Sequence, residues 1–290
     1  MPLPLLETQV VAKGISTPEW LENEMKLGGK QAGLAHLNTS QFTKHPLEVG
    51  TSMTSDSPRL SEIEMVWARC GEKWQDSQLV SHAPTIFKKV TMVNKCGDAA
   101  EALPGNNVDS MSMENVGYEG AGYIKFIIGR YSDLPRWTVF VHGIPEQHNP
   151  GLLEKFYHID QEKLLTLTSH KWLDLNNYFI RGRVLDSNDV GRALSHLPNS
   201  TPELGDPHEP LDFYCCMQQT IQASAIQDRP NEFWERYFKL AFDDVPGESG
   251  TGKTYQHEMG DAYEHTFHRV LGEPLNGMKP DREEVWEQLK

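Results

Sequence analysis

Three side chains able to do acid–base chemistry follow one short apolar run of the chain. The run WTVFV at 137–141 has the length and composition of a buried strand. His142, Glu146 and His148 come directly after it. In an open α/β sheet, ligands bind outside the carboxyl ends of the strands. The end of this run is therefore where we first expect a site.

A helix must lie just before that strand. Ile124, Ile127, Ile128 and Tyr131 are spaced at i, i+3, i+4 and i+7, which is the apolar pattern of an amphipathic helix. Pro135 then ends the helix, because it lacks a backbone N–H and pushes the preceding residue out of the helical region. The sequence predicts a helix, a tight connection and a buried strand.

Polar side chains at the start of this helix can reach the same site. Glu119 and Tyr123 are four residues apart and share one helix face, and Asn115 precedes them. We interpret these three as a polar cluster directed toward the site, although the helix dipole alone also favours an acid at Glu119. Glu264 and His265, in AYEHTFH, could likewise be directed toward the site or lie on the surface of a helix. For these two residues we expect a surface helix face.

Two motifs with other chemistry are set aside. The spacing H-x-x-x-E-x-H matches no common metal signature, and Pro145 prevents one helix face from presenting all three side chains, so no metal ligand is predicted. GESGTGKT at 247–254 satisfies the phosphate-loop pattern. It follows an amphipathic helical segment instead of a buried strand, with 36 residues after it. We interpret it as a loop between two helices.

Composition limits the class of protein. The 290 residues are 38% hydrophobic, so a packed core is available, and there is no apolar run long enough to cross a membrane. The start of the chain lacks the features of a secretory signal, and four scattered cysteines predict no disulfide framework, so we expect a cytoplasmic protein. A formal charge of −14 opposes general nucleic-acid coating and suits a cationic ligand. The best local basic group is Lys88, Lys89 and Lys95.

The rest of the chain is read as an irregular arm, 1–58, followed by one α/β domain, 59–290, with a mixed, mainly parallel sheet. Strands are expected within 61–74, 85–97 and 215–224. Helices are expected within 149–173, 229–244, 262–272 and 281–290. A loop is expected between Cys96 and Met113, and a long surface excursion at 174–210.

Three blocks of the chain resemble a fungal domain-of-unknown-function family. They are VNKCG, then ENVGYEGAGYIKFIIGRYSDLPRWTVFVHGIPEQH, then IQDRPNEFWERYFKL with YEHTFHRVLGEP. The family reads roughly as Y-N-K-G, N-V-G-R-E, Y-x-x-L-P-D-x-T-x-F-x-Q-G-x-P-x-x-H and R-P-x-x-F-Y, and the resemblance covers about residues 62 to 275. Tyr118 stands where the family has Arg, and His142 where it has Gln.

The resemblance implies two activities. The chain is similar to fungal arginine-containing cyclodipeptide synthases, which would join amino acids from arginyl-tRNA and a second aminoacyl-tRNA by acyl transfer without a cofactor. It also resembles nucleotide-sugar glycosyltransferases with a single Rossmann-like (glycosyltransferase-A-like) domain, although the D-x-D pair that holds their metal is missing. A non-catalytic binding protein is a third reading.

Under the first reading, site residues are assigned by role. Acid–base or orienting roles fall to four residues: Glu119, His148, His142 and Tyr123. Pocket acids would hold the substrate guanidinium as bidentate partners, and other groups would contact the substrate. The expected substrate-binding residues are Asn115, Tyr118, Glu114, Glu146, Glu264 and Lys95.

Overall fold

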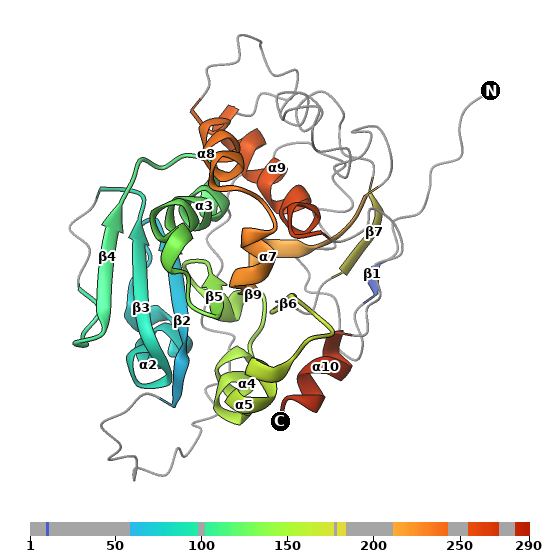
Figure 1. Cartoon of the computed structure of the whole chain (residues 1–290). Helices are drawn as coiled ribbons and strands as arrows, with labels where there is room; N and C mark the ends of the chain where they lie inside the picture. Colours follow the sequence, from blue (N-terminus) through green and yellow to red (C-terminus); the bar gives the residue numbers. More distant parts are fainter. Residues whose placement is uncertain are drawn as a thin grey trace. The chain divides into compact units, whose positions relative to one another are not determined.

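The computed structural model describes residues 10–11, 59–97, 102–176, 179–183, 211–242, 255–272 and 282–290 (Figure 1). The chain divides into two compact units, one formed by residues 1–11 with 58–290 and the other by residues 12–57. The second unit lies outside the described residues, as do nearly all of the expected arm and the GESGTGKT segment. The α/β unit is described by itself.

A six-stranded mixed sheet forms the centre of this unit. Its strand order is β4-β3-β2-β5-β9-β6, in which β2, β3, β4 and β5 are parallel and β9 is antiparallel to both neighbours. The strands are β2 (Leu60–Arg69), β3 (Phe87–Asn94), β4 (Val108–Ser112), β5 (Trp137–Val141), β6 (Trp172–Asp174) and β9 (Gln219–Gln222). The prediction of a Rossmann-like α/β domain with a mixed, mainly parallel sheet is confirmed. A separate antiparallel sheet contains β1 (Val10–Val11), β7 (Phe179–Arg183) and β8 (Leu211–Tyr214).

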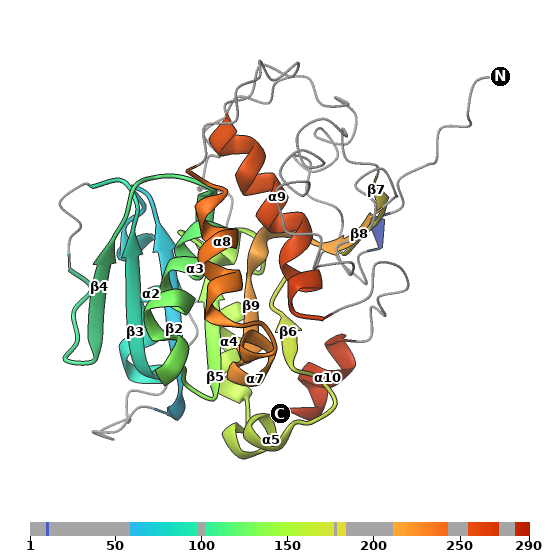
Figure 2. The same ribbon diagram turned by 45° about the horizontal axis from the view of Figure 1, so that its top comes forward.

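Helices cover both faces of the six-stranded sheet (Figures 1 and 2). One face packs against α3 (Tyr118–Arg130), α7 (Ala223–Gln227), α8 (Asn231–Lys239) and α9 (Tyr255–Val270). The other face packs against α2 (Gln78–Ile86), α4 (Leu152–His158), α5 (Gln161–Thr166) and α10 (Arg282–Gln288). The core therefore has two halves, one on each side of the sheet.

Strand alternation assigns side chains to these two halves. On β2, Val66 and Ala68 join the half under α3, whereas Met65 and Trp67 join the half under α2. All four are fully buried. Beyond Glu64 the strand has a continuous apolar run, because a central parallel strand is covered on both faces.

The chain reverses its direction of travel across the sheet between β2 and β5. From β2 it passes through α2 to β3 and on to the edge strand β4, and α3 then carries it back over β3 and β2 to β5. The crevice at such a switch point, outside the carboxyl ends of the strands, is the usual ligand site of an open α/β sheet. Here the switch point lies beyond Arg69 of β2 and Val141 of β5.

Several sequence-based expectations are corrected. The loop expected between Cys96 and Met113 contains β4, and α2 forms from a segment to which no helix was assigned. The single helix expected within 149–173 is two short helices, α4 and α5, followed by β6, and β7 lies inside the expected excursion. The segment 215–224 is strand only at β9. The helices expected within 229–244 and 281–290 are confirmed as α8 and α10, and the one expected within 262–272 is α9, which begins earlier, at Tyr255.

Within the described residues, no helix combines the length and apolar character needed to cross a bilayer.

Candidate functional site

Six side chains gather at the switch point, and we call them the Glu119 cluster: Glu72, Lys95, Glu119, Tyr123, His142 and His148. They come from the segment after β2, the end of β3, the first two turns of α3 and the segment after β5. Alternation along β3 and β5 places Lys95 and His142 on the α3 side of the sheet, continuing the positions of Val93 and Phe140. Glu119 acts electrostatically on His148, so the two residues predicted to share a site are electrostatic neighbours.

A glycine brings α3 close to the strands beneath it. A Cβ atom at Gly122 would lie 3.2 Å from the Cβ atom of Ala68 and 3.8 Å from Cδ of Lys95. The aliphatic stem of Lys95 thus lies along α3, one turn from Glu119. Gly122 is therefore the small residue that lets a buried lysine share this space with a helix.

Glu119 is the common electrostatic neighbour of the cluster. Burial lowers the pKa of Lys95, which is 3% exposed, and the negative charges of Glu119 and Glu72 partly oppose that effect. Burial and then Glu119 raise the pKa of Tyr123 well above its usual value, so the phenol keeps its proton. The ring of Tyr123 lies 5.0 Å from that of Phe140, which fixes it against β5.

The two histidines form an edge-to-face pair with ring centroids 4.7 Å apart. Burial lowers the pKa of His142 to about 4. Burial, with a smaller effect of His142, lowers the pKa of His148 to about 3, against the opposing effect of Glu119. Both rings are therefore neutral at physiological pH, and they offer hydrogen-bonding nitrogens without adding positive charge.

Glu72 and Gly143 close the cluster between β2 and β5. The Glu72 carboxylate accepts a hydrogen bond from the backbone N–H of Cys70, and a Cβ atom at Gly143 would collide with that carboxyl group. The indole Nε1 of Trp67 donates to the carbonyl oxygen of Gly143 at 3.0 Å. Sequence reasoning missed Glu72, although Gly143, two residues after the end of β5, was the available signal of close approach.

A disulfide joins the ends of β2 and β3 beside this cluster. Cys70 and Cys96 are paired, with Cα atoms 4.9 Å apart, and Cys216 is also disulfide-bonded. The sequence separation of 26 residues gave no sign of the Cys70–Cys96 bond. Parallel pairing of β2 with β3 brings the two cysteines together one residue beyond Arg69 and two beyond Asn94.

Glu146 was expected to bind substrate at the end of β5, but its side chain contacts the N-terminus of α2. Its Oε1 accepts hydrogen bonds from Ser77 Oγ at 3.1 Å and from the backbone N–H of Leu79 at 2.5 Å, both at the N-terminus of α2. We call Ser77, Leu79 and Glu146 the α2 junction. Gln218 Nε2 also donates to the carbonyl oxygen of Pro145, at 3.1 Å, so this segment is held on two sides. Glu146 caps a helix here.

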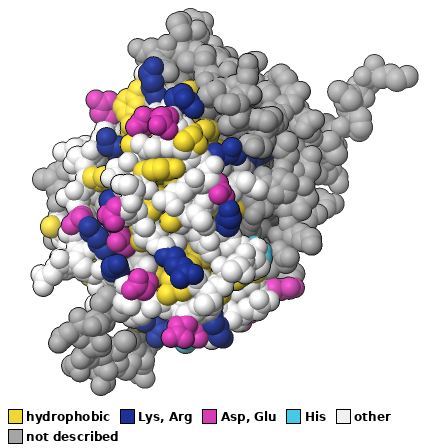
Figure 3. Space-filling view, in the orientation of Figure 1, with side chains coloured by type: hydrophobic (Ala, Val, Ile, Leu, Met, Phe, Trp, Pro, Cys, Tyr) yellow, Lys and Arg dark blue, Asp and Glu magenta, His cyan; other side chains and the backbone are white. Residues whose placement is uncertain are grey.

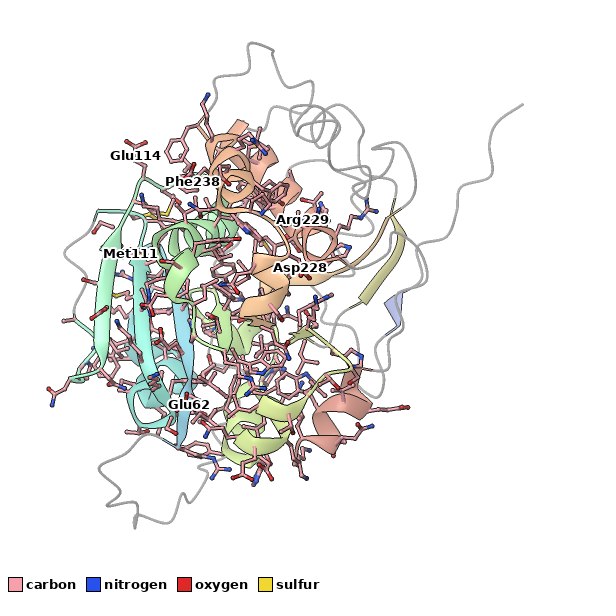
Figure 4. All side chains as sticks on the ribbon, in the orientation of Figure 1. Glu62, Met111, Glu114, Asp228, Arg229 and Phe238 are labelled. Carbon is pink, nitrogen blue, oxygen red and sulfur yellow. A yellow bond between two sulfur atoms is a disulfide. The ribbon has the colours of Figure 1, made fainter. Side chains whose placement is uncertain are left out.

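The other predicted substrate-binding residues are spread around the start of α3. Glu114 and Asn115 are exposed, and Figure 4 shows Glu114 projecting outward beyond the end of β4. Tyr118 has a φ of 45° and packs so closely on α9 that a Cβ atom at Gly260 would collide with its ring. Glu264 accepts a hydrogen bond from the backbone N–H of Cys216 at 2.7 Å. Of this predicted group, Lys95 is the member that joins the Glu119 cluster.

The expected basic group is not a single patch. Lys88 is exposed near the start of β3, whereas Lys95 is buried at the other end of that strand. Lys89 is paired with Asp109 at 2.6 Å. Figure 3 shows basic and acidic side chains interspersed over the described part of the face that is seen in Figure 1.

A hollow of about 400 Å³ lies at the opposite edge of the sheet, at the amino end of β2. It is lined by residues that include Arg59, His158, Asp160 and Lys290, and by no member of the Glu119 cluster. In the described part of the chain, no three or more His, Cys, Asp or Glu side chains are arranged to hold a metal ion.

Comparison of the chain with family models, with curated proteins and with solved structures finds no match.

Proposed function

We propose that this protein is a tRNA-dependent cyclodipeptide synthase that forms an arginine-containing diketopiperazine. The observation that supports this best is the charge of the Glu119 cluster. The carboxylates of Glu119 and Glu72 both act electrostatically on the amine of Lys95, and His142 and His148 are neutral and add no charge. The cluster is net negative even with Lys95 protonated, which favours a cationic substrate.

A guanidinium group suits such a place. It stays charged at all physiological pH values and presents planar N–H pairs that match a carboxylate in a bidentate hydrogen bond. Glu119 is only partly buried, so its carboxylate can reach an arriving substrate. The resemblance to arginine-containing cyclodipeptide synthases agrees with this chemistry.

The proposed reaction is two successive aminolyses. The α-amine of one aminoacyl group attacks the ester carbonyl of the other, a peptide bond forms, and the ester bond to the tRNA 3′ oxygen breaks. Glu119 accepts the proton released by the attacking nitrogen, and the departing tRNA oxygen takes up a proton. The free α-amine of the dipeptidyl ester then attacks the remaining ester carbonyl, which closes the ring and releases the second tRNA.

The partners in this proposal are arginyl-tRNA and a second aminoacyl-tRNA, which also places the protein in the cytoplasm. Disulfides are rare in reducing compartments. Titration of free thiols on Cys70 and Cys96, in protein trapped by alkylation at cell lysis, therefore tests the location. Two thiols would support the cytoplasm, whereas the oxidised pair that the structure contains would count against it.

The function is tested by expressing the chain in a bacterial host fed isotopically labelled arginine. Mass spectrometry of the medium should find a new labelled diketopiperazine that is absent with an empty vector and with Glu119→Gln. Manganese-dependent hydrolysis of a nucleotide sugar, with no diketopiperazine, would instead support a glycosyltransferase. Neither product, with partner binding retained in Glu119→Gln, would support a binding protein.

A further inference from the structure

Two buried polar side chains of the Glu119 cluster have no hydrogen-bond partner for their functional atoms among the described residues. They are the Tyr123 hydroxyl and Nε2 of His142, and their residues are 0% and 9% exposed. Lys95 of the same cluster is 3% exposed, and the charges of Glu119 and Glu72 act on its amine. Buried polar groups in proteins are nearly always hydrogen-bonded, so two such atoms in one cluster need an explanation.

These three groups come from three separate elements. Lys95 follows β3, Tyr123 lies on the second turn of α3, and His142 follows β5. Glu119 acts electrostatically on both Lys95 and Tyr123, and it acts on His148, which stacks edge-to-face with His142. Glu119 is thus an electrostatic neighbour that these elements share.

Charge decides what kind of group fits. Lys95 and Tyr123 are donors, which match an oxygen acceptor, but the neighbouring carboxylates of Glu119 and Glu72 repel a simple anion. A ligand that has a neutral carbonyl oxygen next to a cationic nitrogen satisfies both requirements. An α-amino acyl group has this arrangement, because its ammonium nitrogen and its carbonyl carbon are both bonded to the α-carbon.

We propose that the Glu119 cluster binds an α-amino acyl group, with its carbonyl oxygen held by Lys95 Nζ and Tyr123 OH and its ammonium beside Glu119. This assignment rests on the proposed function and names a subsite of it. When an amine attacks this carbonyl, negative charge develops on the oxygen, and the Lys95 ammonium lies where it stabilises that charge. Lys95 is then a catalytic residue.

The test compares two probes that differ mainly in the carbonyl group. Argininamide has the ammonium, the guanidinium and a carboxamide, whereas agmatine lacks the carboxamide. By calorimetric titration of the purified full chain, the wild type should bind argininamide at least about tenfold more tightly than agmatine. Lys95→Met should remove this preference without weakening agmatine, and Tyr123→Phe should reduce it.

Lys89→Met is the matched control, because Lys89 is a lysine of β3, the strand that Lys95 follows, and it is paired with Asp109. It should keep the wild-type preference. Equal binding of the two probes by the wild type, an unchanged preference in Lys95→Met, or no binding of either probe would overturn the assignment. Thermal melts show whether the variants are folded. If Lys95→Met does not fold, the argininamide preference of Tyr123→Phe tests the subsite independently.

The subsite and the proposed function can fail separately. A wild type that prefers argininamide, and loses that preference in Lys95→Met, keeps the subsite even if bacterial cultures contain no diketopiperazine. A labelled diketopiperazine made equally well by wild type and Lys95→Met keeps the function and rejects the subsite.

Discussion

The Glu119 cluster and the α2 junction both lie near the carboxyl ends of β2 and β5. They differ in how their acidic side chains are hydrogen-bonded. Glu146 is held by two hydrogen bonds from the start of α2. Glu119 has no hydrogen-bond partner among the described residues, and it faces a lysine, a tyrosine and a histidine through electrostatics alone. Oε1 of Glu146 stabilises the fold through these two hydrogen bonds, although its buried Oε2 has no partner among the described residues. Neither oxygen of Glu119 has such a bond, and Glu119 is the carboxylate that we propose for a ligand.

The largest effect is expected from Glu119→Gln, which keeps the shape and removes the charge. Product formation should fall by at least about 100-fold, because substrate binding and proton acceptance both depend on that charge. Stability should change by less than about 1 kcal/mol, which is the size of a helix-dipole interaction. Mass spectrometry of the product and thermal melts measure the two effects, and full product yield would remove Glu119 from the site.

Glu146→Ala should show the opposite pattern. It removes the acceptor for Ser77 Oγ and the Leu79 N–H, so the free energy of unfolding should fall by about 2 kcal/mol. Product formed per folded molecule should stay near the wild-type level. Urea unfolding and mass spectrometry measure this, and a loss of product without a loss of stability would place Glu146 in the site after all.

Acid should destabilise the protein through its buried histidines. Because the pKa values of His142 and His148 are about 4 and about 3 in the folded state, the unfolded chain binds protons first as pH falls below 6.5. Stability is therefore greatest above pH 6.5 and falls toward pH 4, by up to about 1.4 kcal/mol per pH unit for each histidine. His148→Gln should flatten the dependence of the melting temperature on pH, and an unchanged slope would mean that His148 titrates normally.

The smallest effect is expected at an exposed ion pair outside both regions. Lys89 and Asp109 join β3 to the edge strand β4, with side chains 30% and 61% exposed. Lys89→Met should change the free energy of unfolding by less than about 1 kcal/mol and leave the product unchanged. A loss near 2 kcal/mol in urea unfolding would show that such pairs cannot serve as a baseline for the α2 junction.

The parts of the fold that local patterns determine could be predicted. The apolar run of β5 and the 3.6-residue pattern of α3 lie within single segments, and the structure has both where the sequence indicates them. The edge strand β4 could not be recognised, because VDSMS is largely exposed and has no apolar run. Its strand conformation comes from pairing with β3, which local sequence does not encode.

The same limit applies to the site. Glu119 and Tyr123 are linked by helical spacing, so the sequence places them together. Glu146 could not be distinguished from them, because the residue it caps, Leu79, lies 67 residues earlier in the chain. Glu72 was missed for a similar reason, since it meets Gly143 only after β2 and β5 pair.

A crystal structure of the protein grown with argininamide tests the central claim most directly. The account predicts the ligand at the switch point between β2 and β5, with its cationic groups near Glu119 and its carbonyl oxygen near Lys95 and Tyr123. A ligand bound in the hollow at the amino end of β2, with only solvent around Glu119, would contradict it.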